Sequence, residues 1–231
     1  LIGKGVTYDT GGYSIKPSQY MESMKQDLGG AATVLGAFLA IASLGVKKNV
    51  IAVLPSVENS INSYAYRPDD IIKMYNGVTV EVTNTDAEGR IILADALAYT
   101  AKKYSPSYMI DLATLTGSCI YAVGNDFAAV LGTDDKLIEK IIEAGKEAGE
   151  PMWQLPLHQR YKKDLESPVA DIVNASKMRA GTIEGGLFLQ HFVPEKMKWC
   201  HIDIAAVAFD EKKKMATGRD VRMLLELVKK L

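Results

Sequence analysis

Short, continuously apolar runs alternate with longer helix-like stretches along this chain, and this alternation constrains the fold more than any other feature. The runs that predict strands are residues 1–7, 50–54, 78–82, 108–112 and 201–205. The stretches that predict helices are residues 30–44, 90–103, 136–148, 185–192 and 220–230. Strands that are apolar throughout need helices on both sides of their sheet. We therefore predict an α/β fold with a mixed, mostly parallel central sheet and helices on both faces.

Turn signals and composition favour a single folding unit. Asn76-Gly77 directly precedes the apolar run at 78–82, and this dipeptide is typical of a β-hairpin turn, so the sheet is expected to be mixed. The 231 residues, 48% of them hydrophobic, are enough for one substantial core. No repeat, low-complexity tract or linker interrupts the sequence. We expect one domain over residues 1–231.

Charge, cysteine and histidine content argue against several classes of protein. The 27 Lys and Arg residues nearly balance the 28 Asp and Glu residues, so no overall basic field would attract nucleic acid. Two cysteines, Cys119 and Cys200, cannot make a disulfide scaffold, which suits a reducing cytoplasm. The three histidines lack any His-x-x-x-His spacing. Metal ligands in this chain would therefore be mostly oxygen atoms.

The uncharged stretch at residues 28–46 approaches the length of a transmembrane helix. It consists mostly of Gly, Ala, Ser and Thr, with large apolar residues thinly spread. A buried, tightly packed helix accounts for this composition better than a membrane span, and we expect no membrane partner.

The stretch from Asp86 to Arg90 places two carboxylates and a guanidinium at alternate positions, separated by Ala and Gly. In an extended segment, alternate side chains project to one side, and the small intervening residues leave that side open. A solvated loop would explain such a pattern taken alone. A second group of charges among glycines upstream, however, favours a metal site: Lys4, Asp9, Lys16 and Asp27.

The spacing of these residues sets conditions on the backbone. A straight strand would point Lys4 and Asp9 to opposite faces, so a shared site requires the chain to bend between them, which Gly5 permits. Four carboxylates crowded together would repel one another, and two divalent cations would remove that repulsion. Crowding of Asp9, Asp27, Asp86 and Glu88 would thus itself indicate metal.

Four stretches resemble the leucyl (cytosol) aminopeptidase family, in the order and spacing of that family. They are Gly3 to Gly12, Met24 to Ala32, Asn84 to Ile91 and Ala113 to Gly117. The differences from the usual motifs are conservative: Tyr8 for Phe, Thr10 for Ser and Ile91 for Leu. The resemblance covers essentially the whole chain. It implies a catalytic domain whose family partner, an N-terminal domain, is absent from this sequence.

The resemblance implies a centre of two divalent metal ions per chain. Its ligands would be Lys4, Asp9, Asp27, Asp86 and Glu88. Asp9 and Glu88 would bridge both ions, Lys4 and Asp27 would complete the tighter site, and Asp86 the more exchangeable one. Zn²⁺ is the expected ion, with Mn²⁺, Mg²⁺ or Co²⁺ able to substitute at oxygen-rich positions.

The resemblance also implies hydrolysis of the N-terminal residue, preferably leucine or another apolar residue, from peptides with a free N-terminus. Lys16 matches the catalytic lysine that stabilises the oxyanion, and Arg90 the catalytic arginine, thought to hold a bicarbonate. The positions that match the substrate pocket are Met24, Thr114, Leu115, Gly117 and Ala205, together with Ala208. Ordinary core packing explains Ala208 equally well. A homo-hexamer in the cytoplasm is expected.

Four other interpretations fit less well. Asp9-Thr10-Gly11 resembles the aspartic protease motif, but those enzymes are all-β and need two such loops. A serine or cysteine hydrolase would need a histidine partner in a recognisable motif. DNA binding, known in some bacterial family members, disagrees with the neutral charge balance. A catalytically inactive scaffold is disfavoured because all seven metal and catalytic positions carry the matching residue type.

Lys4 poses a specific chemical question. An ammonium group has no lone pair, so Lys4 can bind a metal only as a neutral amine, which adjacent cations and burial would favour by lowering its pKa. The alternative is that Lys4 stays charged and pairs with Asp9 or Asp27. Lys4→Arg distinguishes them, because arginine can pair with a carboxylate but does not bind metal.

Overall fold

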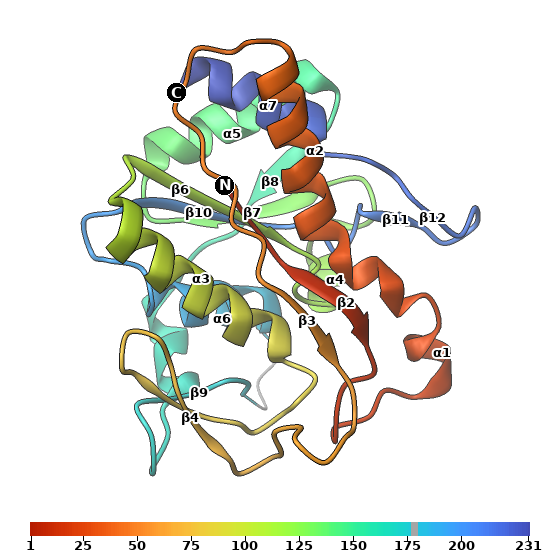
Figure 1. The fold of residues 1–231 in the computed structure, drawn as a ribbon, viewed down its shortest axis with the longest axis vertical. Helices are drawn as coiled ribbons and strands as arrows, with labels where there is room; N and C mark the ends of the chain where they lie inside the picture. The colour runs from red at the N-terminus through yellow and green to blue at the C-terminus, as the bar shows by residue number, and fades with distance from the viewer. Residues whose placement is uncertain (177–179) are drawn as a thin grey trace.

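A five-stranded sheet forms the centre of the protein in a computed structural model, which describes residues 1–176 and 180–231 (Figure 1). In spatial order its strands are β1 (Ile2–Gly3), β6 (Tyr108–Ala113), β10 (Lys198–Asp203), β7 (Ala128–Gly132) and β8 (Met152–Gln154). Every neighbouring pair is parallel except β10 and β7, which are antiparallel. The predicted mixed, mostly parallel sheet is confirmed.

Helices cover both faces of this sheet, as predicted (Figure 1). One face is covered by α2 (Gly29–Ser43), α5 (Asp135–Ala148) and α7 (Val221–Lys230), and the other by α3 (Glu88–Tyr104) and α6 (Gly181–Gln190). Successive residues of β6 alternate between the two cores: Met109 packs with α3 and α6, and Ile110 packs with α2, α5 and α7. The central strands are buried on both sides, which explains their continuously apolar sequence.

Helix ends follow local signals where the sequence provides them. Asp134 caps α5 by accepting a hydrogen bond from the Leu137 N–H, and Gly149 ends this helix in the left-handed conformation. The small residues at the start of α2 serve a different purpose. A Cβ atom on Gly30 would overlap the Leu112 carbonyl oxygen, so only glycine lets α2 begin directly against the end of β6.

Three smaller sheets and several short helices surround the central sheet. The sheets pair β2 (Gly5–Asp9) with β3 (Ser56–Asn59), β11 (Phe209–Asp210) with β12 (Met215–Ala216), and β5 (Thr79–Glu81) with both β4 (Ile71–Lys73) and β9 (Ile172–Val173). The short helices are α1 (Ser18–Met21), η1 (Met24–Leu28), α4 (Ser118–Val123) and η2 (Gln159–Leu165). The Asn76-Gly77 hairpin is confirmed between β4 and β5. This hairpin lies outside the central sheet, which is mixed because β10 and β7 are antiparallel.

Several predicted strands need correction. Residues 1–7 form two strands, β1 and β2, that separate at Lys4 into different sheets. Residues 50–54 are not a strand. The two-residue strand β1 offers them only one bridge, Ile2–Val53, and the strand of this region, β3, begins later at Ser56. The strand predicted at 201–205 begins at Lys198 and ends at Asp203, where a turn starts. The prediction missed β7 and β8.

The segment Met24–Ser43, which consists of η1 and α2, is by length and composition apolar enough to span a membrane. In the structure, Val34, Ala37 and Ile41 of α2 are buried, whereas Leu35 and Leu39 are exposed. Val34 and Ala37 pack in the core of the domain, as predicted for this stretch.

Candidate metal centre

The predicted site residues gather where the parallel strands end. Lys4 follows β1, Thr114 follows β6, and Ala205 lies just after β10. The carboxyl ends of neighbouring parallel strands meet at one edge of a sheet, and loops there commonly form the active sites of α/β proteins. Lys4 lies at the break between β1 and β2, and the β2–β3 register is irregular between Val6 and Asp9, so the chain from Lys4 to Asp9 is not one regular strand.

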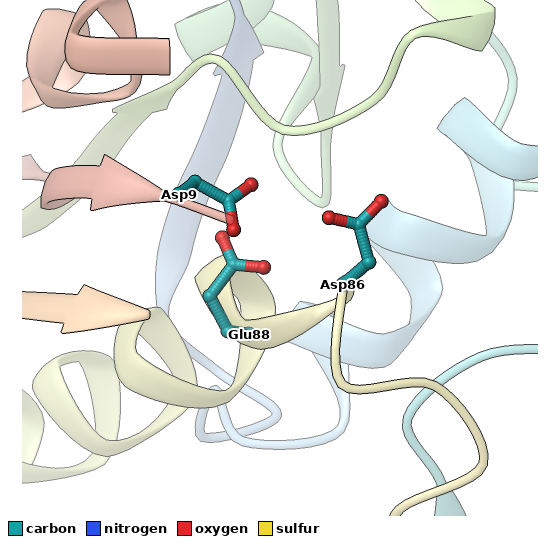
Figure 2. Close-up of side chains that lie close together, drawn as sticks. All are labelled: Asp9, Asp86 and Glu88. Carbon is teal, nitrogen blue, oxygen red and sulfur yellow. The ribbon is translucent and has the colours of Figure 1, made fainter. Parts of the chain in front are cut away.

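Three carboxylates form the centre of the site. Asp9 ends β2, Glu88 opens α3, and Asp86 lies in the turn before that helix; each offers an oxygen atom within 4.8 Å of the others. Figure 2 shows the Asp9 and Glu88 carboxylates directed toward one another, with Asp86 on the adjoining turn. An irregularity in the β2–β3 register between Val6 and Asp9 re-aims the end of the strand. The Asn84 side chain fixes the turn by accepting a 2.8 Å hydrogen bond from the Asp86 N–H.

Lys4 connects Asp27 to this group. Its Nζ lies 2.7 Å from Asp27 Oδ1 and 3.2 Å from Glu88 Oε1, and it donates to the Thr114 carbonyl at 2.9 Å. A Cβ atom on Gly89 would lie 2.7 Å from Lys4 Nζ, so glycine after Glu88 leaves room for this lysine. Asp27 Oδ2 is buried and has no hydrogen-bond partner among the described residues.

Lys16 contacts the two carboxylates of the group that Lys4 does not pair with. Its Nζ lies 2.8 Å from Asp9 Oδ2 and 2.5 Å from Asp86 Oδ1. The carboxylates are thus held between two lysines. Burial tends to lower the pKa of the Lys16 ammonium, but its contacts with Asp86 and Asp9 outweigh burial and raise it.

The same competition acts on the buried groups. Burial raises the pKa of Glu88 to about 7, with Asp9 and Asp27 adding to the effect and Lys4 opposing it. For Lys4, burial lowers the pKa, but Asp27, Glu88 and Asp9 together raise it above its usual range. In this structure Lys4 thus pairs with Asp27, and its role as a metal ligand stays a prediction.

The donor set fits divalent metal ions. Four carboxylates at one strand edge, one with an unpartnered buried oxygen, offer the oxygen ligands that such ions prefer. A lysine amine could complete the set after losing its proton. The residues that would hold metal are those predicted: Lys4, Asp9, Asp27, Asp86 and Glu88.

Arg90 lies on the first turn of α3, buried beneath the site. It donates from Nη1 to the Asn174 carbonyl at 2.9 Å and lies 6.0 Å from the Phe188 ring centre. Burial lowers its pKa, while Glu184, Glu88 and Asp203 oppose that change. The carboxylates of Glu184, Glu88 and Asp203 thus favour the positive charge of Arg90.

Of the predicted substrate-binding residues, Thr114 contacts a predicted metal ligand directly. Thr114 donates from Oγ1 to Asp27 Oδ1 at 2.7 Å, and a Cβ atom on Gly29 would touch both Thr114 and Ala208 at 3.4 Å. The remaining positions lie on adjoining elements: Met24 opens η1, Leu115 follows Thr114, Gly117 precedes α4, and Ala205 follows β10. Gly117 faces open space, because a Cβ atom there would meet nothing within 4 Å.

Sequence reasoning missed three buried residues that hold the site. Asn59 contacts Asp9, Asn174 holds both Arg90 and the turn at Asn84, and Asp203 accepts hydrogen bonds from the Leu115 N–H and the Thr116 hydroxyl. Each is a single polar residue at a strand end or in a loop, far along the chain from the group it supports. No local spacing signals such a role.

Fold and site together define an α/β protein with a carboxylate-rich centre suited to divalent metal ions. The sequence model of the cytosol aminopeptidase family, catalytic domain, matches residues 1–225. The chain belongs to this family of metal-dependent peptidases.

Relatives and a solved structure agree with this assignment. A probable cytosol aminopeptidase of Chlorobium limicola is 48% identical over 233 residues, covering 100% of this chain and 46% of that protein. One of Geobacter sulfurreducens is also 48% identical, covering 99% of this chain and 47% of that protein. A solved structure, the bottromycin maturation enzyme BotP in complex with Mn, superposes with a TM-score of 0.94 at 40% identity and covers 100% of this chain and 52% of that one. The chain spans about half the length of the curated relatives that it matches.

Proposed function

We propose that this domain is a two-metal aminopeptidase that hydrolyses the N-terminal residue of peptides, preferably leucine or another apolar residue. The observation that carries the proposal is the convergence of Asp9, Asp86 and Glu88 within 4.8 Å, beside the Lys4–Asp27 pair. The Mn complex of the structurally similar BotP supports a metal at this type of centre.

Two bound divalent ions would lower the pKa of a bound water and polarise the scissile carbonyl, which supplies a nucleophile at neutral pH. The protein residues have separate tasks. Lys16, on the exposed side of the carboxylates, would stabilise negative charge on the carbonyl oxygen of the reacting peptide. Arg90 is the cation that would hold a bicarbonate acting as general base, because its guanidinium is fixed by Asn174 close to the centre.

Substrate selection would follow from the shape of the same strand edge. Thr114 and Ala208 flank Gly29, and Met24 opens the neighbouring η1, so small and apolar groups adjoin this side of the centre. Carboxylates at the centre would bind the free amine of a peptide through the metal ions, which favours removal of terminal residues over internal cleavage. Leu115, Gly117 and Ala205 would add further contacts to an apolar N-terminal side chain.

The remaining expectations belong to the same proposal. Zn²⁺ is the expected ion, with Mn²⁺, Mg²⁺ or Co²⁺ as substitutes. We propose a cytoplasmic homo-hexamer that binds neither membrane nor nucleic acid; the near-equal numbers of acidic and basic residues support the last point.

Metal content measured together with hydrolysis of a leucyl chromogenic substrate tests the proposal. Chelation should abolish hydrolysis, and Zn²⁺ or Mn²⁺ should restore it at two ions per chain. Full activity in protein that retains less than one ion per chain would refute the two-metal mechanism.

Lys4→Arg sharpens the test. Arginine keeps a positive charge beside Asp27 and Glu88 but does not bind metal, so we expect severe weakening of the tighter metal site in calorimetric titration. Binding of two ions with near-native affinity would exclude Lys4 as a ligand.

A further inference from the structure

Asn59, the last residue of β3, places a neutral amide inside the group of charges. It pairs in register with Asp9 on β2, and only 5% of its surface is exposed. Its backbone carbonyl accepts hydrogen bonds from both the N–H and the hydroxyl of Thr10 at 2.9 Å, which ties β3 to the chain just after Asp9. The Asn59 side chain is thus anchored beside the carboxylates.

The amide contacts both carboxylates proposed to bridge the ions. Asn59 Nδ2 lies 2.8 Å from Asp9 Oδ1, 3.0 Å from the Thr85 carbonyl oxygen and 3.4 Å from Glu88 Oε2. Its Oδ1 faces Gly12, where an added Cβ atom would lie only 3.0 Å away. One nitrogen therefore links the end of β2 to the start of α3, two segments that the sequence separates widely.

Asn59 differs from the other donors to these carboxylates in having no charge. Lys4 and Lys16 are cations that contact the same group, and divalent ions would bring positive charge to the same oxygens. A neutral amide does not compete electrostatically with a metal ion. Asp9 Oδ1 accepts only neutral donors among the described residues, the Gly11 N–H and Asn59, whereas Oδ2 faces Lys16. The two oxygens of Asp9 thus have different surroundings.

We propose that Asn59 is a positioning residue that holds Asp9 and Glu88 at the separation that two divalent ions require. This inference rests on the proposed metal centre. Without the amide, the two carboxylates would lose their shared neutral donor and repel one another. Groups that orient metal ligands in this way commonly contribute about 10–100-fold to metal affinity.

Calorimetric titration of the chelated and dialysed protein with Zn²⁺, and absorption spectra with Co²⁺, test the inference without relying on activity. We expect Asn59→Ala to weaken metal binding about 10–100-fold and to change the Co²⁺ d–d bands. Asn62→Ala is the matched control, because Asn62 is an exposed asparagine whose side-chain amide contacts, among the described residues, only the nearby Ser60 carbonyl and the Tyr64 N–H. It should bind both ions as the unchanged protein does.

Circular dichroism shows whether each variant is folded. If Asn59→Ala does not fold, Asn59→Thr replaces it, since threonine suits a strand and its shorter hydroxyl cannot span the same contacts. A folded variant with wild-type affinity and Co²⁺ spectrum would overturn the inference and leave the metal centre intact. If the unchanged protein binds no divalent ion, both the proposed function and this inference fail.

Discussion

The two faces of the central sheet bury different kinds of side chain, although the same strands form both. Toward α2, α5 and α7, β6 and β10 present apolar residues such as Leu112 and Ile202. At the alternate positions, toward α3 and α6, the same strands present Asp111, His201 and Asp203, each fully buried. Alternation along these strands thus gives the sheet an apolar side and a polar side, where these buried polar groups lie among apolar residues such as Met109 and Trp199.

Partners explain why the polar side is tolerated. Asp111 accepts a 2.7 Å hydrogen bond from Trp199 Nε1 and lies 2.6 Å from His201 Nδ1. Asp203 accepts hydrogen bonds from the Leu115 N–H and the Thr116 hydroxyl, in the loop proposed to bind substrate. Buried charge is stable only when it is paired or hydrogen-bonded. The buried residues Asp111, His201 and Asp203 therefore extend from the core toward the proposed site. We expect mutations on the two faces of the sheet to have different effects.

The largest effect is expected from breaking the Asp111–His201 pair. Removing one partner of a buried ion pair typically destabilises a protein by about 3–5 kcal/mol, and we expect this loss for Asp111→Asn in urea unfolding near pH 6. Burial lowers the pKa of His201, but Asp111 outweighs burial and raises it. The pair's stabilisation is therefore complete below the unfolded-state pKa and lost as pH rises through the folded-state pKa. Asp111→Asn should lack that decline; an unchanged pH profile would contradict the assignment.

The next largest effect concerns catalysis on the polar side. Lys16→Ala and Arg90→Ala should lower kcat by about 10²–10³, the range typical for loss of one charge-stabilising donor, while metal content stays at the wild-type value. Steady-state kinetics with a leucyl substrate and metal analysis measure both quantities. Lys25→Ala, at a neighbouring exposed lysine, is the control. Loss of metal with unchanged activity per bound ion would show that these residues hold the ions instead.

One buried carboxylate on the apolar side lacks such partners among the described residues, and its replacement should change stability in the opposite direction. Asp220, before α7, is fully buried, and neither of its side-chain oxygens has a hydrogen-bond partner in the described part of the chain. Burial raises its pKa to about 7, with Glu150 adding to the shift and Arg219 opposing it.

The sign of the Asp220 effect follows from proton binding. Between about pH 4 and pH 7 the folded protein holds a proton that the unfolded chain has lost, so stability falls over this window. Asp220→Asn should therefore stabilise the protein by roughly 2–4 kcal/mol at pH 8 and have little effect at pH 4. Asparagine also tolerates the positive φ of 70° at this position. Destabilisation at pH 8 would refute this account.

The smallest effect is expected within the apolar face itself. Ile202→Val removes one methylene from the core under α2, α5 and α7 and should destabilise the protein by about 0.5–1.5 kcal/mol. Its pH profile of stability and its kcat should match those of the unchanged protein. A change in either would show that the two faces are coupled more strongly than their packing indicates.

The sequence predicted those parts of the fold that depend on local pattern. The helices α2, α3, α5 and α7 and the strand β6 lie close to their predicted bounds, because long periodic or continuously apolar stretches determine the elements they form. The two-residue strand β1, the single bridge at Val53 and the short strand β8 lie beyond that reach, whereas β7 is a continuously apolar run that the prediction overlooked. Short strands form where a neighbouring strand offers hydrogen bonds, and pairing is not a local property.

The same division applies to the site. The sequence alone identified the candidate residues of the proposed centre, from Lys4 to Arg90. Carboxylates, lysines and glycines at these spacings suit a metal site, and their motifs match one family. Tertiary structure alone decided that Lys4 pairs with Asp27, that Asn59 joins Asp9 to Glu88, and that Asp220 remains without a partner. The physical reason is that charges and amides interact through space, so their partners depend on which distant segments the fold brings together.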